Sequence, residues 1–589
     1  MFSASGPTAA STQESPIPLD TVTAVGTRLL PGLSGQTRAV EVLDRDRIES
    51  LPARTIAQVL DWALAVDVLA RSPAQADISI RGSGFEQVLV LIDGVPVSDP
   101  QTGHFDMDLA LPLDQVERIE ILRGPASSQY GTDAMGGAVN VVTRAAAQSL
   151  AGRVEGGSFG TLAGSLGGGI GVASVRLAAG GGFSRSDGHR EGTDYRVSQL
   201  QVRAEAPLAS GDVVAQVGQS WKDFGAADFY APYPSYEETR TTRVSTWWRR
   251  LLTDAIEFKP RFYLRRHRDH FILDRQNPEF YANSHLSSQV GAEAVIRHRG
   301  SSRLKWVVGG SFGHELLESS NLGDRSQDRW AVFGEAVTSL GPIMLSAGLR
   351  GDAHQGYALV TSPSVSATAW LRSLRIRGSF GGSFRAPNWT ERYYEDPYNR
   401  GRADLKPERS WTSEIGADLW ATSDISMSLT AYRRRAVNLI DWARDEDGGE
   451  DTPWQTRNVE SATFRGLEAT LNVSAGEANV SIQGSVASLT GDHVEGFVSK
   501  YALRPLVRDL VAMAGRSFGP VKGHLSAKHR RRQGEAGYWL LDMRLGIPIR
   551  VGEFYLDLLN GLDVEYQEVT GVPAPGRSLI LGFRSGQRR

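Results

Sequence analysis

The sequence predicts an all-β transmembrane barrel of about 22 antiparallel strands, with a smaller α+β domain in front of it at the N-terminus. From residue 145 onward apolar and polar residues alternate. In residues 465–473, for example, Leu467 and Leu471 fall on one face of a strand and Glu468 on the other. The chain has 64 Gly among 589 residues, with 13 Trp, 16 Tyr and 20 Phe, which suits turns and aromatic belts at membrane interfaces. No run approaches the roughly 18 apolar residues that a membrane-spanning helix needs.

The strand number follows from the length of the alternating region. Residues 145–583 at about 20 residues per strand and loop give about 22 strands, the number found in plugged outer-membrane transporters. The last strand is expected at residues 577–583, where Leu579, Leu581 and Phe583 face one way. Residues 584–589 then form a short C-terminal tail.

Residues 1–144 follow a different pattern. Residues 1–19 are rich in Ser, Thr, Ala and Pro and are expected to be disordered. Further along, apolar residues recur at helical spacing and predict one short amphipathic helix; they are Ile48, Leu51, Ile56, Val59, Leu60 and Leu64. Around it, β-branched residues predict strands, with Gly94 at a turn; these strands lie at residues 40–43, 78–84, 88–97 and 116–125.

Composition excludes several classes of function. The net charge of -3 argues against nucleic acid as a partner, because binding to a phosphate backbone needs a basic excess. The absence of Cys excludes thiol catalysis, disulfides and Cys-ligated metal sites. The Gly-rich segment 131–140 lies between expected strands with no helix after it, so it is not a phosphate-binding loop. We expect neither enzyme activity nor a metal centre.

Three blocks of sequence, in order along the chain, resemble the family of TonB-dependent outer-membrane receptors. The first spans residues 78–143 and contains ISIRGSG, VLVLIDGVPVSDP and VERIEILRGP. The second, residues 383–419, reads SFRAPNWTERYYEDPYNRGRADLKPERSWTSEIGADL. The third, residues 558–583, reads LLNGLDVEYQEVTGVPAPGRSLILGF. Length and layout are most similar to the cobalamin-receptor branch of the family.

The resemblance implies an organisation and a compartment. Residues 29–144 would form a plug domain inside the lumen of a barrel at 145–583. Residues 20–28 would carry the TonB box, a segment that pairs with the periplasmic TonB protein through backbone hydrogen bonds. The box residues are Asp20, Thr21, Val22, Thr23, Ala24 and Val25. The protein would be a monomer in the outer membrane of a Gram-negative bacterium, importing a scarce ligand with energy delivered by TonB.

Charged residues are expected to hold the plug in place. Arg81 and Arg123 lie on plug strands that must face the barrel wall, and a buried arginine is costly unless it is paired. By alternation, Glu414 and Glu468 lie on the inward face of the barrel. The resemblance implies that these arginines pair with these glutamates. The alternative is that each of the four is separately solvated in a wet lumen.

The ligand surface is expected at the plug loop around residues 98–106 and in an extracellular loop of the barrel. Phe105 offers a ring for stacking on a flat ligand, and His104 either approaches a metal complex or binds water. Aromatic residues of the barrel loop either contact the ligand or belong to the aromatic girdle. The predicted ligand-binding residues are Asp99, His104, Phe105, Tyr230, Tyr233 and Tyr236.

The identity of the ligand stays open between cobalamin and a ferric siderophore. Calcium is a second open question: the acidic segment 441–451 could supply oxygen ligands, but its spacing does not match an EF-hand. In segment 186–196, which corresponds to the calcium loops of cobalamin receptors, only Asp187 and Asp194 are acidic at the expected places. Further expected partners are outer-membrane lipid and a periplasmic binding protein. The alternatives are a passive plugged porin and a soluble all-β binding module, although no repeat of fixed period supports the latter.

Overall fold

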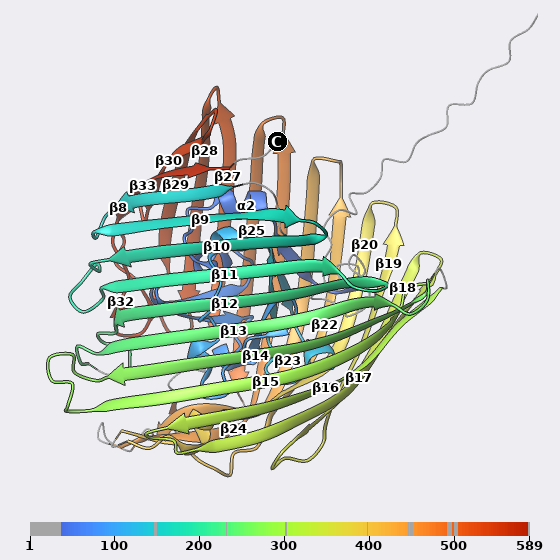
Figure 1. Ribbon diagram of the computed structural model, residues 1–589, viewed down its shortest axis with the longest axis horizontal. Helices are drawn as coiled ribbons and strands as arrows, with labels where there is room; N and C mark the ends of the chain where they lie inside the picture. Colours follow the sequence, from blue (N-terminus) through green and yellow to red (C-terminus); the bar gives the residue numbers. More distant parts are fainter. Residues whose placement is uncertain are drawn as a thin grey trace, which may run out of the picture.

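A closed barrel surrounds a small N-terminal domain in the computed structural model of this chain (Figure 1). The structure describes residues 37–145, 150–230, 232–300, 303–396, 398–445, 447, 452–491, 497–499 and 505–586. Three predicted segments lie outside the described residues: the N-terminus 1–19, the TonB box region 20–28 and the end of the C-terminal tail. Residues 446 and 448–451 of the acidic segment 441–451 lie outside them as well.

The N-terminal domain, which we call the plug, is built on a five-stranded sheet and a separate hairpin. The sheet order is β1-β6-β7-β4-β5; β4 and β7 are parallel and the other neighbours antiparallel. The predicted strands are present. The sheet strands are β1 (Val40–Leu43), β4 (Val88–Ile92), β5 (Val95–Pro96), β6 (Val116–Arg123) and β7 (Gly137–Thr143); the hairpin strands are β2 (Val66–Ser72) and β3 (Gln75–Ile80).

The turn between β4 and β5 lies at the predicted Gly94. Asp93 and Gly94 both have positive φ, 51° and 77°. A two-residue hairpin turn that follows the twist of its strands needs positive φ at both central residues, and Asp-Gly is a favoured pair there. Three short 3-10 helices, η1 (Phe85–Gln87), η2 (Gly103–Phe105) and η3 (Leu113–Gln115), lie in the connections.

The single amphipathic helix predicted between residues 48 and 64 is wrong in one respect, because it is broken in two. Helix α2 (Arg45–Ser50) ends at Leu51, which is extended with φ −81° and ψ 143°. Pro52 follows, and a residue before proline is pushed out of the helical region. Helix α3 (Ile56–Leu60) then begins with a capping box formed by Thr55 and Gln58. A last short helix of the plug is α4 (Ser127–Tyr130).

The barrel has 22 antiparallel strands, as predicted, and closes where its last strand pairs with its first. The strands are β8 (Ala151–Gly157), β9 (Thr161–Val172), β10 (Val175–Ser186), β11 (Tyr195–Pro207), β12 (Gly211–Gly225), β13 (Tyr236–Leu251), β14 (Ile256–Ile272), β15 (Ala282–His298), β16 (Leu304–Ser319), β17 (Arg325–Leu340), β18 (Ile343–His354), β19 (Val360–Leu371), β20 (Leu374–Arg385), β22 (Glu408–Trp420), β23 (Ile425–Asp445), β24 (Trp454–Ala475), β25 (Ala478–Gly491), β27 (Leu506–Phe518), β28 (Val521–Arg532), β29 (Tyr538–Ile549), β30 (Gly552–Leu559) and β33 (Ser578–Ser585). Smaller elements sit in the loops: α5 (Trp389–Tyr393), β21 (Asn399–Arg400), β26 (Phe497–Ser499), β31 (Gln567–Val569) and β32 (Val572–Pro573).

Alternation along these strands sorts side chains between the outer surface and the lumen. Leu467 is 51% exposed on the outside, whereas its neighbour Glu468 is 2% exposed and faces inward. In the last strand Leu579 and Leu581 are exposed and Ile580 is buried. This is the pattern of a barrel whose outer face meets lipid. Among the described residues, no helix is long and apolar enough to span a membrane.

The two ends of the barrel differ in the length of their connections. At one end the strands are joined by turns such as Ala173 to Ser174 and Gly476 to Glu477. At the other end the connections are longer, as between β12 and β13 or between β20 and β22. In barrels of the outer membrane the short turns are periplasmic and the long loops extracellular. Figure 1 shows the blue plug enclosed by the strands between these two ends.

Candidate functional site

The structure brings all four residues of the predicted charge cluster together, and we call them the lock: Arg81, Arg123, Glu414 and Glu468. Arg81 Nε and Nη2 donate to the two carboxylate oxygens of Glu468 at 2.6 and 2.7 Å. Its Nη1 donates to Glu414 at 2.7 Å. Arg123 lies 3.3 Å from Glu468. Because all four side chains are at most 9% exposed, separate solvation does not describe them.

Further charges and one ring complete the lock. Glu41 of the plug receives a hydrogen bond of 2.5 Å from Arg123 Nη1. Arg377 of the barrel donates to the second oxygen of Glu414 at 2.6 Å. The guanidinium of Arg81 also lies 4.3 Å from the centroid of the Tyr432 ring. Each buried charge of the lock therefore has an opposite charge beside it, which offsets the cost of its desolvation.

The sequence did not predict a second set of plug-to-barrel ion pairs, which we call the β28 anchor. Asp61, at the end of α3, is bound by Lys528 and Arg530, and Arg530 also donates to the Asp61 carbonyl at 2.9 Å. Arg532 binds both carboxylate oxygens of Asp67 on β2. A signal existed, because bases at positions 528, 530 and 532 lie on one face of a strand.

The apex loop of the plug, residues 98–106, faces the long loops but its predicted contact residues are turned inward. Asp99 is 5% exposed, bound by Arg265 of β14 and by the Ser287 hydroxyl at 2.8 Å. Burial raises the pKa of Asp99, but the charge of Arg265 and the hydrogen bonds that Asp99 accepts from Arg265 and Gln101 help to bring the net pKa below its ordinary value. The Phe105 ring is 3% exposed and packs 4.4 Å from the His267 ring, so in this structure it offers no free face to a ligand.

His104 joins the apex loop to the β2–β3 hairpin. Its Nδ1 lies 2.9 Å from Asp77 Oδ2, which also accepts from Arg71 at 2.6 Å. Its ring stacks on Phe85 at 4.4 Å between centroids. Burial raises the pKa of Asp77, yet the charges of His104 and Arg71 lower it more, so the net pKa is below the ordinary value. His104 is thus engaged by an acid inside the plug.

The three predicted tyrosines lie at the extracellular end of the barrel, where they contact other loops. Tyr230 approaches His104 at 5.9 Å between ring centroids and donates to Glu237 at 3.3 Å. Tyr233 stacks on Phe280 at 6.2 Å. Tyr236 lies under the guanidinium of Arg275 at 4.3 Å. Of the predicted ligand residues, Tyr230 and His104 are the two that meet across the boundary between barrel and plug.

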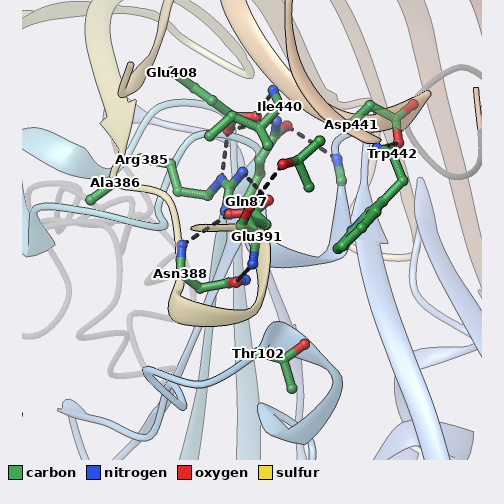
Figure 2. Close-up of polar contacts among 12 residues, drawn as sticks. Gln87, Thr102, Arg385, Ala386, Asn388, Glu391, Glu408, Ile440, Asp441 and Trp442 are labelled. Carbon is green, nitrogen blue, oxygen red and sulfur yellow. Dashed lines mark hydrogen bonds and ion pairs between the residues drawn. The ribbon is translucent and has the colours of Figure 1, made fainter. Parts of the chain in front are cut away.

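A further buried hub ties the long loop after β20 to the plug (Figure 2). Arg385 Nη1 and Nη2 donate to Glu391 at 2.9 and 2.7 Å, and its Nε donates to Glu408 at 2.7 Å. Gln87 of the plug reaches the same oxygen of Glu408 at 2.9 Å. From α5 the Trp389 amide donates to the carbonyl of Pro100 in the apex loop at 3.1 Å. The loop is therefore folded inward onto the plug.

The remaining predictions concern the TonB box and metal ions. Residues 20–25 are outside the described part of the chain, so the box stays a prediction. No group of three or more His, Cys, Asp or Glu that could hold a metal ion occurs among the residues that the structure describes. Asp194, one of the two acids named for a calcium loop, is bound by Arg275 at 2.6 Å.

Comparison with known proteins agrees with this architecture. Residues 143–560 match the family described as TonB dependent receptor-like, beta-barrel, and residues 33–138 match the TonB-dependent Receptor Plug Domain. The vitamin B12 transporter BtuB of Photobacterium profundum is 25% identical over 455 residues, covering 74% of this chain and 73% of that protein. The iron-regulated outer membrane virulence protein of Vibrio cholerae is 26% identical over 524 residues, covering 80% and 77%.

Solved structures share the fold at lower identity. The ferric enterobactin receptor PfeA of Pseudomonas aeruginosa superposes with a TM-score of 0.78 at 17% identity, covering 96% of this chain and all of that one. The siderophore receptor PirA of the same organism gives a TM-score of 0.74 at 19% identity, covering 93% and 98%. The family match spans most of the chain and both of its domains: the protein belongs to the TonB-dependent receptors of the Gram-negative outer membrane.

Proposed function

We propose that this receptor imports cobalamin or a ferric siderophore across the outer membrane, with work delivered by TonB at residues 20–25. One observation carries the proposal: a folded plug closes the lumen and is bound to the barrel wall by buried ion pairs on several sides. The lock, the Arg532–Asp67 pair of the β28 anchor and the pair of Asp99 with Arg265 are each nearly excluded from solvent.

Moving such a plug requires a large free energy, and this distinguishes the protein from a passive pore. Separating a buried ion pair leaves an uncompensated charge, which costs about 3–5 kcal/mol. Several pairs of this kind surround the plug, so thermal motion does not open it at a useful rate. The outer membrane has neither ATP nor a maintained ion gradient. The work must therefore reach the plug from the inner membrane, as a pull on the segment before β1.

Two ligand classes are proposed on different grounds. The BtuB relatives, at about 25% identity over nearly three quarters of the chain, favour a cobalamin. The iron-regulated relative of Vibrio cholerae covers somewhat more of the chain and favours an iron chelate. Tyr233 and Tyr236, at the extracellular rim, are the residues that we propose to contact the ligand first, since tyrosine gives rigid contact area with a polar tip.

The test is binding and uptake with cyanocobalamin and with ferric enterobactin. Purified protein in detergent is titrated with each, with and without calcium, and cells carrying the receptor are assayed for uptake with TonB present or deleted. We expect binding of one ligand without TonB and uptake only with TonB. Uptake that persists without TonB identifies a passive pore and contradicts the proposal. Binding that requires calcium would assign the ion to the ligand site.

The same preparation reports whether the receptor is a monomer, as we propose, and whether a periplasmic binding protein receives the ligand.

A further inference from the structure

Two cavities lie on one side of the plug, between the helices α2 and α3 and the barrel wall. The lower cavity has a volume of about 910 Å³ and reaches Glu477 in the short turn between β24 and β25 and Gly586 directly after β33. The upper cavity has a volume of about 180 Å³ and reaches Phe159 and His189 next to the long loops. Elsewhere around the plug, two cavities against β14–β18 have volumes of only about 70 and 50 Å³.

The two cavities lie end to end along the barrel wall, with side chains between them. On β28, Ser526 lines the lower cavity and Lys528 the upper one. These residues are two apart on one face of a strand, a separation of about 7 Å. On β29, Arg544 and Asp542 divide in the same way between the lower and upper cavity. Residues 51–54 of the plug alternate between the two cavities: 51 and 53 line the lower one, and 52 and 54 the upper one. One layer of side chains separates them.

Asp61 and Lys528 of the β28 anchor, with Trp62, line the upper cavity at this boundary. Asp61 binds Lys528 and Arg530, and Lys528 Nζ lies 3.9 Å from the centroid of the Trp62 ring. Eight Arg and Lys and five Asp and Glu line the lower cavity, which gives it a basic excess. Of these bases, Arg47, Arg516 and Lys522 have no carboxylate within 4.0 Å among the described residues. An anionic or polar solute that passes the layer would therefore enter a space of ligand size with favourable charge.

We propose that the translocation path of this receptor runs off-axis through this sector, between the face of the plug that carries α2 and α3 and the wall β28–β30, and that the Asp61–Lys528 contact is its gate. In this arrangement the lock and the Arg265 contact stay closed while the gate opens. The plug then needs only local rearrangement of segment 51–61, rather than withdrawal from the barrel. The inference rests on the proposed import function for its physiological meaning, but the path itself can be tested without a ligand.

The first test is ion conductance of the purified full-length protein in planar bilayers. Asp61→Asn removes the carboxylate that holds Lys528, whereas Arg530 keeps Asp509 at 3.3 Å, so Lys528 is released and the gate opens. We expect conductance to rise several-fold over the unaltered protein. The matched control is Asp108→Asn, which breaks the buried contact of the plug with Lys222 on β12, outside both cavities; its conductance should stay low. Equal conductance of the two variants would overturn the proposal.

The second test places a reporter in the path, which the absence of native Cys makes clean. In the Asp61→Asn background, Ser526→Cys is modified with an anionic methanethiosulfonate. The control is Ser366→Cys on β19, a similarly buried position (7% against 4% exposed) that lines neither large cavity. We expect modification to block conductance only at Ser526→Cys. Conductance that survives there means that the ions take another route. Heat-modifiable gel mobility checks that each variant retains its barrel.

A third arm connects the path to uptake. Asp61→Cys and Lys528→Cys are joined by a short reducible bis-thiosulfonate, and uptake of cyanocobalamin and ferric enterobactin is measured before and after reduction. We expect the tether to abolish uptake, without loss of surface binding, and reduction to restore it. Undiminished uptake with the tether in place would refute the gate. If neither probe is taken up by the untethered protein, the ligand assignment fails, while the conductance results still decide the path.

Discussion

Arg81 and Glu468 form a two-pronged ion pair between residues 387 positions apart in the chain, at 2.6 and 2.7 Å. Arg81 itself has positive φ, 54°, a backbone conformation that side-chain-bearing residues rarely adopt. Arg81, directly after β3, is thus a strained residue whose side chain is held by the barrel wall. The pair connects the local geometry of the plug to its attachment.

Breaking this pair on one side should cost more than removing it altogether. Arg81→Met leaves Glu468 with the longer contact to Arg123 and should lower the opening free energy of β3 by about 3 kcal/mol. In Arg81→Met/Glu468→Leu, Arg123 keeps Glu41 and Glu414 keeps Arg377, so no buried charge is left alone. The opening free energy of β3 should therefore fall less in the double variant than in Arg81→Met. Hydrogen exchange of the β3 amides by mass spectrometry measures both.

The matched control for the lock is Arg249→Met, which removes an ion pair with Asp212 in which both side chains are about half exposed. A pair of this kind contributes at most about 1 kcal/mol. If the opening free energy lost in the double variant equals the sum of the losses in Arg81→Met and in Glu468→Leu, the two residues act independently and the lock is not a coupled unit.

The Arg385 hub gives a second prediction. Arg385→Met leaves Glu391 and Glu408 facing each other without a cation, and both are at most 4% exposed. We expect α5 to detach from the apex loop, at a cost of about 3–5 kcal/mol, because two buried carboxylates lose their counter-charge. Protease cleavage within residues 386–407 should appear in the variant and not in the unaltered protein.

Arg385→Lys should rescue α5 only in part, because an ammonium cannot bind both carboxylates as a planar fork does. Arg402→Met is the surface control: its pair with Asp404 is exposed, and its loss should leave the cleavage pattern unchanged. Complete rescue by lysine would show that charge alone, and not the fork, holds the loop.

The sequence predicted the barrel, the plug and the lock because each depends on local pattern or on the resemblance to the family. The alternation of apolar and polar residues is enough to place Glu414 and Glu468 on the inward face, without any information on tertiary contacts. The β28 anchor was missed although its bases alternate at 528, 530 and 532, because no pattern says which acid of the plug they meet. That pairing depends on how the plug is rotated in the barrel.

In the apex loop, too, tertiary contacts that the sequence does not reveal decide the outcome. Phe105 and Asp99 have the chemistry of a ligand surface, but Arg265 and His267 of β14 hold them inside. Those contacts join residues more than 150 positions apart, and only tertiary packing decides them. The break between α2 and α3 was, by contrast, predictable in principle, because Pro52 stands in the middle of the apolar period.

Acid should weaken the β28 anchor. Burial raises the pKa of Asp61. The charges of Arg530 and Lys528 and their hydrogen bonds together lower it by more, so that the net pKa is about 2. Since this is below the ordinary value of about 4, the stabilisation is fully present above about pH 4 and is lost as the pH falls towards about 2, amounting to about 2 kcal/mol. Hydrogen exchange of α3 against pH should show this loss. The Asp61→Asn variant should lack it, and an identical pH profile in the variant would contradict the assignment.

The opposite pH dependence is expected where the β31–β32 hairpin meets the plug. Glu568 Oε2 accepts from the Ala70 amide of β2 at 3.1 Å. Burial and the neighbouring Asp61 raise the pKa of Glu568 to about 7, although Arg530 and Lys528 act to lower it. A carboxyl with a raised pKa stabilises the folded state fully below its ordinary pKa of about 4. This contribution is lost as the pH rises through about 7, by up to about 3 kcal/mol.

The Ala70 amide should therefore exchange faster between about pH 5 and 8, after correction for its intrinsic rate, because the hairpin loosens as Glu568 ionises. Glu568→Gln keeps an acceptor for that amide and cannot ionise, so its corrected profile should be flat. Asp563→Asn changes an exposed acid of the same loop, paired with Arg577 at 3.3 Å, and should leave the slope intact. Protection that increases with pH would mean that the bases of the β28 anchor outweigh burial at Glu568. The extracellular hairpin would then tighten on the plug as the medium becomes alkaline.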